Sequence, residues 1–143
     1  MKIVGQTTGG VSISSCEQSD VGVTSWTNIT SLPIALDGLA MVTLLGKAYV
    51  IGGWNGASSQ ASVNMYDGVS VWVVKAAMSP GRYGHRALAL DDDRALVCGG
   101  HAPTEVVNTC VIYTASTNTW TTASAMAQAR HWFNLVMLEG MWH

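Results

Sequence analysis

The sequence repeats itself with a period close to 47 residues, and this repetition restricts the fold more than any other feature. Three apolar residues precede the glycine pair Gly52-Gly53, and Tyr66 and Trp72 follow it. The same order returns one period later in Gly99-Gly100, Tyr113 and Trp120. The three landmarks are displaced by 47, 47 and 48 residues. Equal offsets indicate an internal repeat, and a period near 50 residues is typical of propeller blades.

The first part of the chain holds a degenerate copy of the same unit. Cys16 to Asp20 aligns with 63–67, and Trp26 aligns with Trp72, but Gln6 stands where the second glycine is expected and Ser19 where the tyrosine is expected. Terminal repeats are commonly atypical.

A second repeated segment lies between each tryptophan and the next glycine pair. Residues 78–90 and 126–138 align at an offset of 48, so that Arg82 matches Arg130, and 32–44 is the first copy. No window shows a helical period of apolar residues. Each unit therefore offers four short strands separated by turn residues. The strands are expected at 2–6, 13–19, 23–29, 38–44, 47–52, 62–66, 71–76, 84–90, 94–99, 108–113, 119–123 and 131–138.

A glycine pair, a tyrosine and a tryptophan at this spacing resemble the kelch repeat, and the resemblance covers nearly the whole chain. It implies an all-β fold, a β-propeller of four-stranded blades like the central domain of galactose oxidase. We expect the large rings to fill the spaces between neighbouring blades. The structural repeat residues are Gly52, Gly53, Tyr66, Trp72, Gly99, Gly100, Tyr113, Trp120 and Trp26.

Twelve strands make three blades, whereas closed propellers have four to eight. We expect one domain over residues 1–143, with blade units at about 1–30, 38–76 and 84–123. The expected strand at 131–138 has no blade of its own, so residues 131–143 would complete the first unit of a partner. Two copies would then close a six-bladed ring. The predicted partner is a second copy of the chain, and the alternative is that the chain is a piece of a longer protein.

Strand alternation brings every second connection to the same side of the fold. In kelch proteins loops at this face commonly bind a partner, and the resemblance implies a protein or small-molecule ligand here. The candidate binding residues are Trp54, Asn55, Arg82, Tyr83, His101, Glu105, Arg130 and His131. For the two arginines we favour the alternative of a structural role, as hydrogen-bond donors to carbonyls or acids between blades. Trp54 could equally be an ordinary turn residue.

The sequence carries no catalytic signature. It lacks a nucleophile elbow, a P-loop and a dinucleotide fingerprint. His85, His101 and His131 come from different repeats without ligand spacing, so no metal or cofactor is predicted. The favoured function is a non-catalytic binding and assembly module. The alternative is a fragment or half of a larger kelch-containing enzyme, oxidase- or lyase-like, with its catalytic residues outside this chain.

The composition argues against two classes of partner, nucleic acid and anionic membranes. Charged residues make up 11% and the formal net charge is −2, which gives no long-range attraction to nucleic acid or to an anionic membrane. The first five residues contain no apolar signal region, so a cytoplasmic location is predicted. Cys98 and Cys110 flank a predicted hairpin and could face each other across two strands. Because three cysteines are an odd number, we favour buried free thiols over a disulfide framework.

Overall fold

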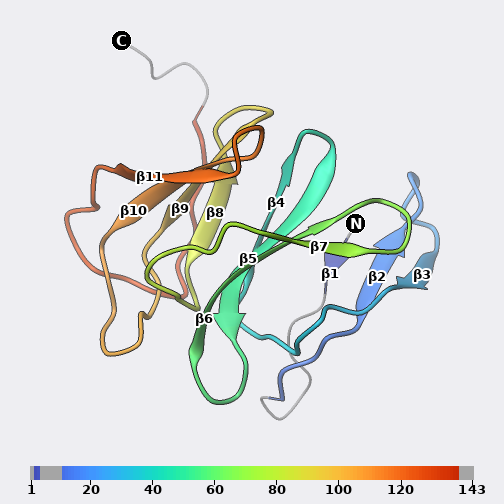
Figure 1. Cartoon of the computed structure of the whole chain (residues 1–143), viewed down its shortest axis with the longest axis horizontal. Helices are drawn as coiled ribbons and strands as arrows, with labels where there is room; N and C mark the ends of the chain where they lie inside the picture. Colours follow the sequence, from blue (N-terminus) through green and yellow to red (C-terminus); the bar gives the residue numbers. More distant parts are fainter. Residues whose placement is uncertain (1, 4–10, 139–143) are drawn as a thin grey trace.

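The chain forms an all-β fold of three antiparallel sheets in the computed structural model (Figure 1), which describes residues 2, 3 and 11–138. These residues contain no helix, and therefore none long and apolar enough to cross a membrane. The first sheet has the order β1 (Lys2–Ile3), β2 (Cys16–Ser19), β3 (Trp26–Ile29). The second has the order β4 (Ala40–Leu44), β5 (Lys47–Trp54), β6 (Ser59–Tyr66), β7 (Trp72–Lys75). The third has β8 (Arg86–Ala89), β9 (Arg94–Cys98), β10 (Cys110–Thr114), β11 (Thr119–Ala123).

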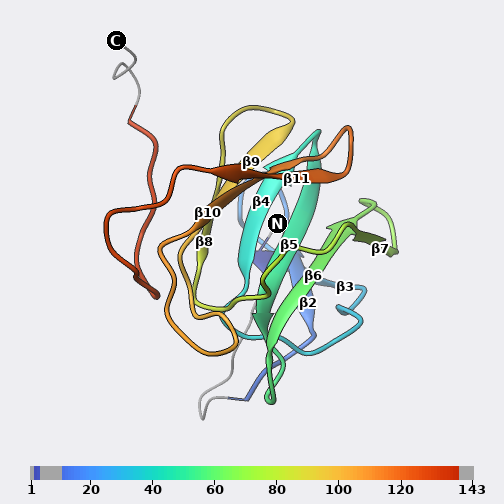
Figure 2. The ribbon, with the colours of Figure 1, turned by 60° about the vertical axis from the view of Figure 1, so that its left-hand side comes forward.

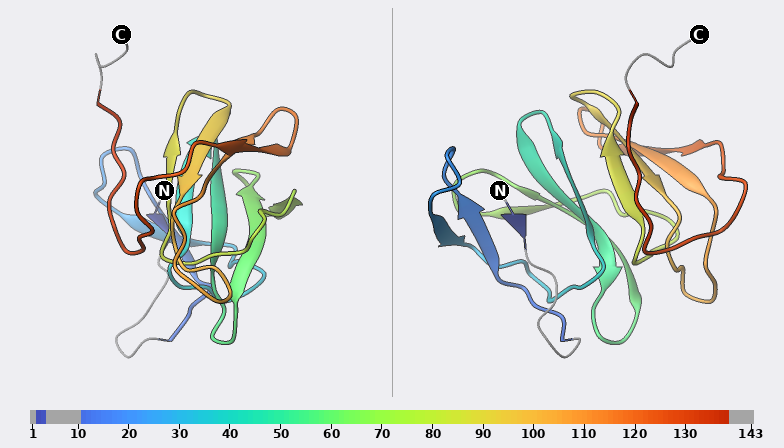
Figure 3. Two further views of the ribbon diagram at one scale, coloured as in Figure 1. Left: turned by 90° about the vertical axis from the view of Figure 1, so that its left-hand side faces the viewer. Right: turned by 180° about the vertical axis from the view of Figure 1, so that it is seen from behind.

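The three sheets stand side by side in chain order, as the rotated views show (Figures 2 and 3). One hydrophobic cluster packs the second sheet against the third, and Tyr49 and Tyr113 meet in it with ring centroids 5.7 Å apart. Another cluster packs the first sheet against the second through Cys16, Leu36 and Val50. Each sheet is therefore buried by its neighbour along the chain, as expected of repeated units that cannot bury an apolar face alone.

The central strand of the second sheet shows why the apolar run precedes the glycine pair. Tyr49, Val50 and Ile51 are all buried, although successive strand residues point to opposite faces. A strand covered on both faces needs such a continuous apolar run. The strand then bulges between Ile51 and Gly53. Gly52 has a φ of +61°, and a Cβ there would lie 2.6 Å from the carbonyl oxygen of Arg82, so only glycine fits.

The repeated landmarks make the same contacts in successive units. The backbone N–H of Gly53 donates to the Arg82 carbonyl at 2.9 Å, and that of Gly100 donates to the Arg130 carbonyl at 2.8 Å. The indole of Trp72 donates to Thr30, and that of Trp120 donates to Ala76, each joining its sheet to the segment that follows the preceding sheet. The expected placement of tryptophans between neighbouring units is observed.

The strand expected at 131–138 is not formed within the single chain, because these residues belong to no sheet of it. Their repeat equivalents, β4 and β8, are held by pairing with β5 and β9, the strands that follow them. No described strand follows 131–138, so its backbone has no ladder to join. Of the predicted strand at 2–6, Lys2 and Ile3 pair with β2, and residues 4–6 lie outside the described residues. The other predicted strands differ from the observed ones only in their bounds.

Candidate functional site

The connections predicted to share one face do so. The β5–β6 loop, the β9–β10 loop and the links 76–85 and 124–130 lie at the lower end of the fold in Figure 1, opposite the turns at 45–46 and 91–93. Backbone bridges tie Asp37 and Tyr83, in the connections that lead into the second and third sheets, to Trp54 and His101. Tyr83 and His101 exchange two hydrogen bonds of 3.1 and 2.8 Å, and Asp37 and Trp54 exchange two of 2.9 and 2.8 Å. We call this end the loop face.

Five rings gather at the loop face, and we name them the loop-face aromatic cluster: Trp54, Tyr83, His101, His131 and Trp132. Tyr83 lies at the centre, stacked on His101 with centroids 5.2 Å apart and tilted against Trp54 at 5.1 Å and Trp132 at 6.2 Å. His131 closes the group, 6.4 Å from His101 and 6.5 Å from Trp132. Four of the eight predicted binding residues are thus brought together from successive units.

Trp132 was not among the predicted residues, and it has the most unusual backbone of the cluster. Its φ is +52°, and the equivalent positions of the earlier units hold Gly38 with φ +55° and Gly84 with φ +63°. The three residues form a hydrogen-bonded chain, in which Trp132 N donates to Gly84 O and Gly84 N donates to Gly38 O, both at 2.8 Å. A non-glycine residue in this region is strained and points to a functional constraint. The aligned glycines were the sequence signal that could have identified the position.

The other predicted loop residues have less to offer a ligand. The side-chain oxygen of Asn55 accepts the backbone N–H groups of Ala57 and Ser58, so it shapes its turn. Glu105 is exposed, and its carbonyl accepts the N–H of Ala102. The carbonyl of the same Ala102 accepts a hydrogen bond from Nδ1 of His101 at 2.5 Å.

Arg82 is fully buried, in agreement with the structural role that we favoured for it over contact with a ligand. Its guanidinium donates to the carbonyls of Gly99 and Thr109 at 3.0 Å each, which joins the second unit to the third. Burial lowers the pKa of Arg82 below its ordinary value. Arg130, at the equal repeat position, is exposed instead, and its side chain makes no hydrogen bond with the described residues.

His85 is also fully buried, and neither ring nitrogen has a partner in hydrogen-bond geometry among the described residues. Burial first, and then the positive charge of Arg82, lower its pKa to about 3. The imidazole is therefore neutral at ordinary pH and acts as a packing group beside Gly52. Within residues 11–138, no three histidine, cysteine, aspartate or glutamate side chains are placed to hold a metal ion.

The favoured interpretation of free thiols at Cys98 and Cys110 is wrong, because the two form a disulfide. They face each other directly in the β9–β10 ladder, with Cα atoms 4.2 Å apart. The equivalent pair in the second sheet is Ile51 and Val63. Cys16 is buried and unpaired, and burial raises the pKa of its thiol.

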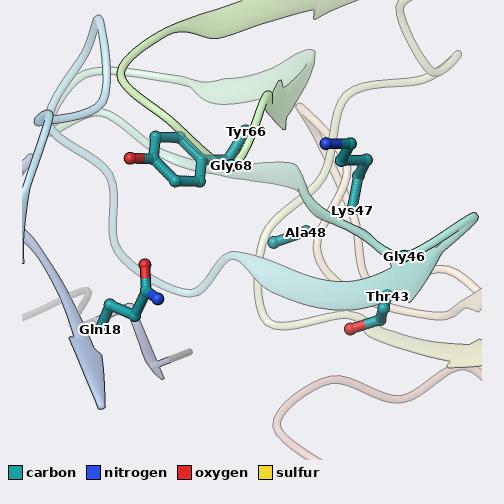
Figure 4. Close-up of a pocket in the computed structure, with 7 residues that line it drawn as sticks. All are labelled: Gln18, Thr43, Gly46, Lys47, Ala48, Tyr66 and Gly68. Carbon is teal, nitrogen blue, oxygen red and sulfur yellow. The ribbon is translucent and has the colours of Figure 1, made fainter. Parts of the chain in front are cut away.

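A hollow of about 210 Å³ lies on the opposite side, between the first and second sheets (Figure 4). Gln18 of β2 and Tyr66 of β6 face its opening, and Lys47 extends toward the turn at Gly68. Its strongest polar groups are already paired, because Lys47 donates to the Asp67 carbonyl and the Tyr66 hydroxyl to that of Val69. The hollow therefore offers a ligand little, and of its lining residues Tyr66 belongs to the repeat, where it was expected as a structural residue.

Comparison with known proteins adds no family, since no protein-family model and no curated protein matches the chain.

Proposed function

We propose that this chain is a kelch-type binding and assembly module, and that two copies pair to close a six-bladed propeller with a ligand-binding loop face. One observation carries the assembly. The second and third sheets each have four strands, the first has three, and the segment 131–138, equivalent to the innermost strands β4 and β8, is left over.

The left-over segment already makes the contacts that lead into an innermost strand. The Arg130 carbonyl accepts from Gly100, as the Arg82 carbonyl accepts from Gly53. Phe133 lies where a Cβ on Gly99 would be, as His85 does at Gly52. Beyond this point Val136 and Leu138 are exposed to solvent, with relative accessible surfaces of 71% and 62%. An exposed apolar segment with free backbone groups favours pairing with another chain.

In the proposed pair, 131–138 of each copy adds to the edge strand β1 of the other. The two seams are identical, as a two-fold axis requires. Arg130 would then donate hydrogen bonds to the partner, as Arg82 donates to the carbonyls of Gly99 and Thr109. This would explain why Arg82 is buried and Arg130 is exposed in a single chain, although the two arginines hold equal repeat positions.

The loop-face aromatic cluster supports the binding half of the proposal. Aromatic residues are enriched at binding hot spots because their rings bury large areas. Five rings from successive units meet there, and His131 and Trp132 are exposed.

Light scattering tests the assembly. We expect a particle near 30 kDa, twice the 15.1 kDa chain, that dissociates on dilution. Val136→Lys with Leu138→Lys should yield a monomer, because lysine at an edge opposes strand pairing. The matched control, Val69→Lys with Val74→Lys, alters equally exposed valines near and in β7 and should leave the dimer intact. A folded monomer for the unaltered chain would favour the alternative, a piece of a larger kelch protein.

A further inference from the structure

We propose that the Cys98–Cys110 disulfide controls the pairing of two copies, because it fixes the loop that positions the segment 131–138 for its partner. This inference rests on the proposed assembly and adds its regulation. The disulfide lies at the base of the β9–β10 loop, and the link 124–130, which leads into 131–138, is hydrogen-bonded to that loop.

The link is attached to both arms of the β9–β10 loop, close to the two cysteines. On the arm that follows β9, the N–H of Gly100 donates to the Arg130 carbonyl at 2.8 Å. On the arm that precedes β10, the Asn108 carbonyl accepts the N–H of Met126, and the Asn108 side chain donates to the Met126 carbonyl, both at 2.9 Å. The direction of the link therefore depends on how the two arms lie relative to each other.

The packing of the left-over segment gives the same dependence. Gly99 follows Cys98 directly, and a Cβ on Gly99 would lie 2.7 Å from the ring of Phe133 and 3.0 Å from the methyl group of Met126. The start of the segment thus packs on backbone that the disulfide anchors. The disulfide closes the base of the two arms, where the N–H of Gly99 also donates to the Thr109 carbonyl at 3.1 Å.

The equivalent link of the second unit, 76–85, is attached to its loop in the same way but without a disulfide. The N–H of Gly53 donates to the Arg82 carbonyl at 2.9 Å, and that of Met78 donates to the Ala61 carbonyl at 2.8 Å. An apolar pair stands at the place of the two cysteines. This link continues into β8, and the β8–β9 ladder holds its far end.

The third unit lacks such a ladder. Trp132 donates to the Gly84 carbonyl as Gly84 donates to Gly38, but no described strand pairs with 131–138. The disulfide therefore lies in the unit whose link leads into an unpaired segment. A segment that is already ordered loses less conformational freedom when it binds, so its association is stronger. The disulfide gives the third link part of the order that the β8–β9 ladder gives the second.

The redox state of the pair is set while the chain folds. Cys98 and Cys110 are 2% and 3% exposed, so a reagent reaches their sulfur atoms when the hairpin opens. The oxidant is a small external disulfide. The thiolate of one cysteine attacks it and releases one thiol, and the thiolate of the other then attacks the mixed disulfide and releases the second. The two released thiols carry the two electrons that the cysteines lose. Pairing of the copies is thus favoured where such an oxidant is present during folding.

The test compares chain refolded from urea with oxidised glutathione and chain refolded with dithiothreitol, each shown to be folded by circular dichroism. We expect the dissociation constant of the dimer, measured by sedimentation, to be about tenfold lower for the oxidised chain. Cys98→Ile with Cys110→Val copies the apolar pair of the second sheet and should pair as weakly as the reduced chain in both media. Cys16→Val is the control, because valine is the residue at the equivalent position 63, and it should keep the difference between the media.

Hydrogen exchange separates ordering of the link from general loss of stability. In the variant Val136→Lys with Leu138→Lys, which should stay monomeric, reduction should speed exchange at the amides of Gly100 and Met126. The equivalent amides of Gly53 and Met78 should not change. Equal acceleration at all four amides would overturn the inference.

Equal dissociation constants in the two media, with the thiols of the reduced chain titrating as free, would also overturn the inference and leave the assembly standing. Absence of a dimer in both media would refute the assembly itself, and the inference with it.

Discussion

His85 occupies a position at which the other units carry Leu39 and Phe133, so the second link buries an ionisable ring where its equivalents are apolar. The pKa of His85 is about 3 in the folded protein, below the ordinary value of 6.5. Between these two pH values the unfolded chain therefore binds a proton at His85 that the folded chain does not bind. The stability that the neutral ring contributes is complete above about pH 6.5 and is lost as the pH falls toward 3. Between pH 7 and 5 we expect a loss of about 2 kcal/mol.

Urea unfolding from pH 5 to 7.5 measures this loss, and His85→Phe is the matched variant. Phenylalanine is the residue at the equivalent position 133, so the variant should fold and should lose most of the dependence on pH. An unfolding free energy that falls equally in both proteins would show that other groups cause the dependence.

Residue identity alone did not predict residue environment at the two arginines. The repeat places Arg82 and Arg130 at the same position, but a guanidinium can be buried without an acid only where carbonyls receive it. Gly99 and Thr109 of the third unit supply these carbonyls to Arg82. No described unit follows Arg130. The spacing could predict the position of each arginine, whereas its burial depended on what the next unit contributes.

At the scale of the hairpin, the disulfide between β9 and β10 replaces the apolar pair Ile51 and Val63 of the second sheet. Closing a loop between residues 12 apart stabilises a chain by about 3 kcal/mol in the chain-entropy account. We therefore expect a reductant to lower the melting temperature by several degrees.

The double variant Cys98→Ile with Cys110→Val copies the second sheet and should fold with a melting temperature that no longer responds to reductant. Unaltered chain that melts at the same temperature with and without reductant, while its thiols titrate as free, would contradict the disulfide.

The strands themselves were largely predictable, because short apolar runs between glycines, prolines and aspartates leave few alternatives. The bounds moved where hydrogen bonding decided them. β6 begins at Ser59 because its pairing with β5 continues past the bulge as far as the pair of Trp54 and Ser59. The segment 131–138 has the apolar content of a strand, but no neighbouring strand of the chain pairs with it. The sequence pattern shows the apolar content and does not show whether a pairing strand is present.

At the scale of the molecule, the period predicted that successive units would form successive antiparallel sheets with their loops on one face, and this is observed (Figures 1 and 3). It also predicted four members of the loop-face aromatic cluster, since loop residues follow from strand alternation. Trp132 was not predicted, because the prediction used the positions at which the units agree. Trp132 instead stands at a position where the other two units carry glycine. The hollow near Lys47 was not predicted, because its lining comes from two sheets and the repeat residue in it, Tyr66, was assigned a structural role.

The assembly makes a further prediction for two copies joined in one chain. Direct fusion leaves six residues between Leu138 of the first copy and Lys2 of the second, a connection of ordinary length between strands. One seam of the proposed ring then becomes a hairpin within the chain, and the other closes between its ends. Because the partner is covalently attached, its effective concentration no longer depends on dilution. We expect the fused protein to be a monomer of about 30 kDa, with a melting temperature independent of concentration and above that of the single chain in dilute solution. The single chain should melt at higher temperature as its concentration rises, since folding and association are then linked. A fused protein that dimerises through its ends, or a single chain whose melting temperature is constant over a hundredfold dilution, would exclude the paired ring.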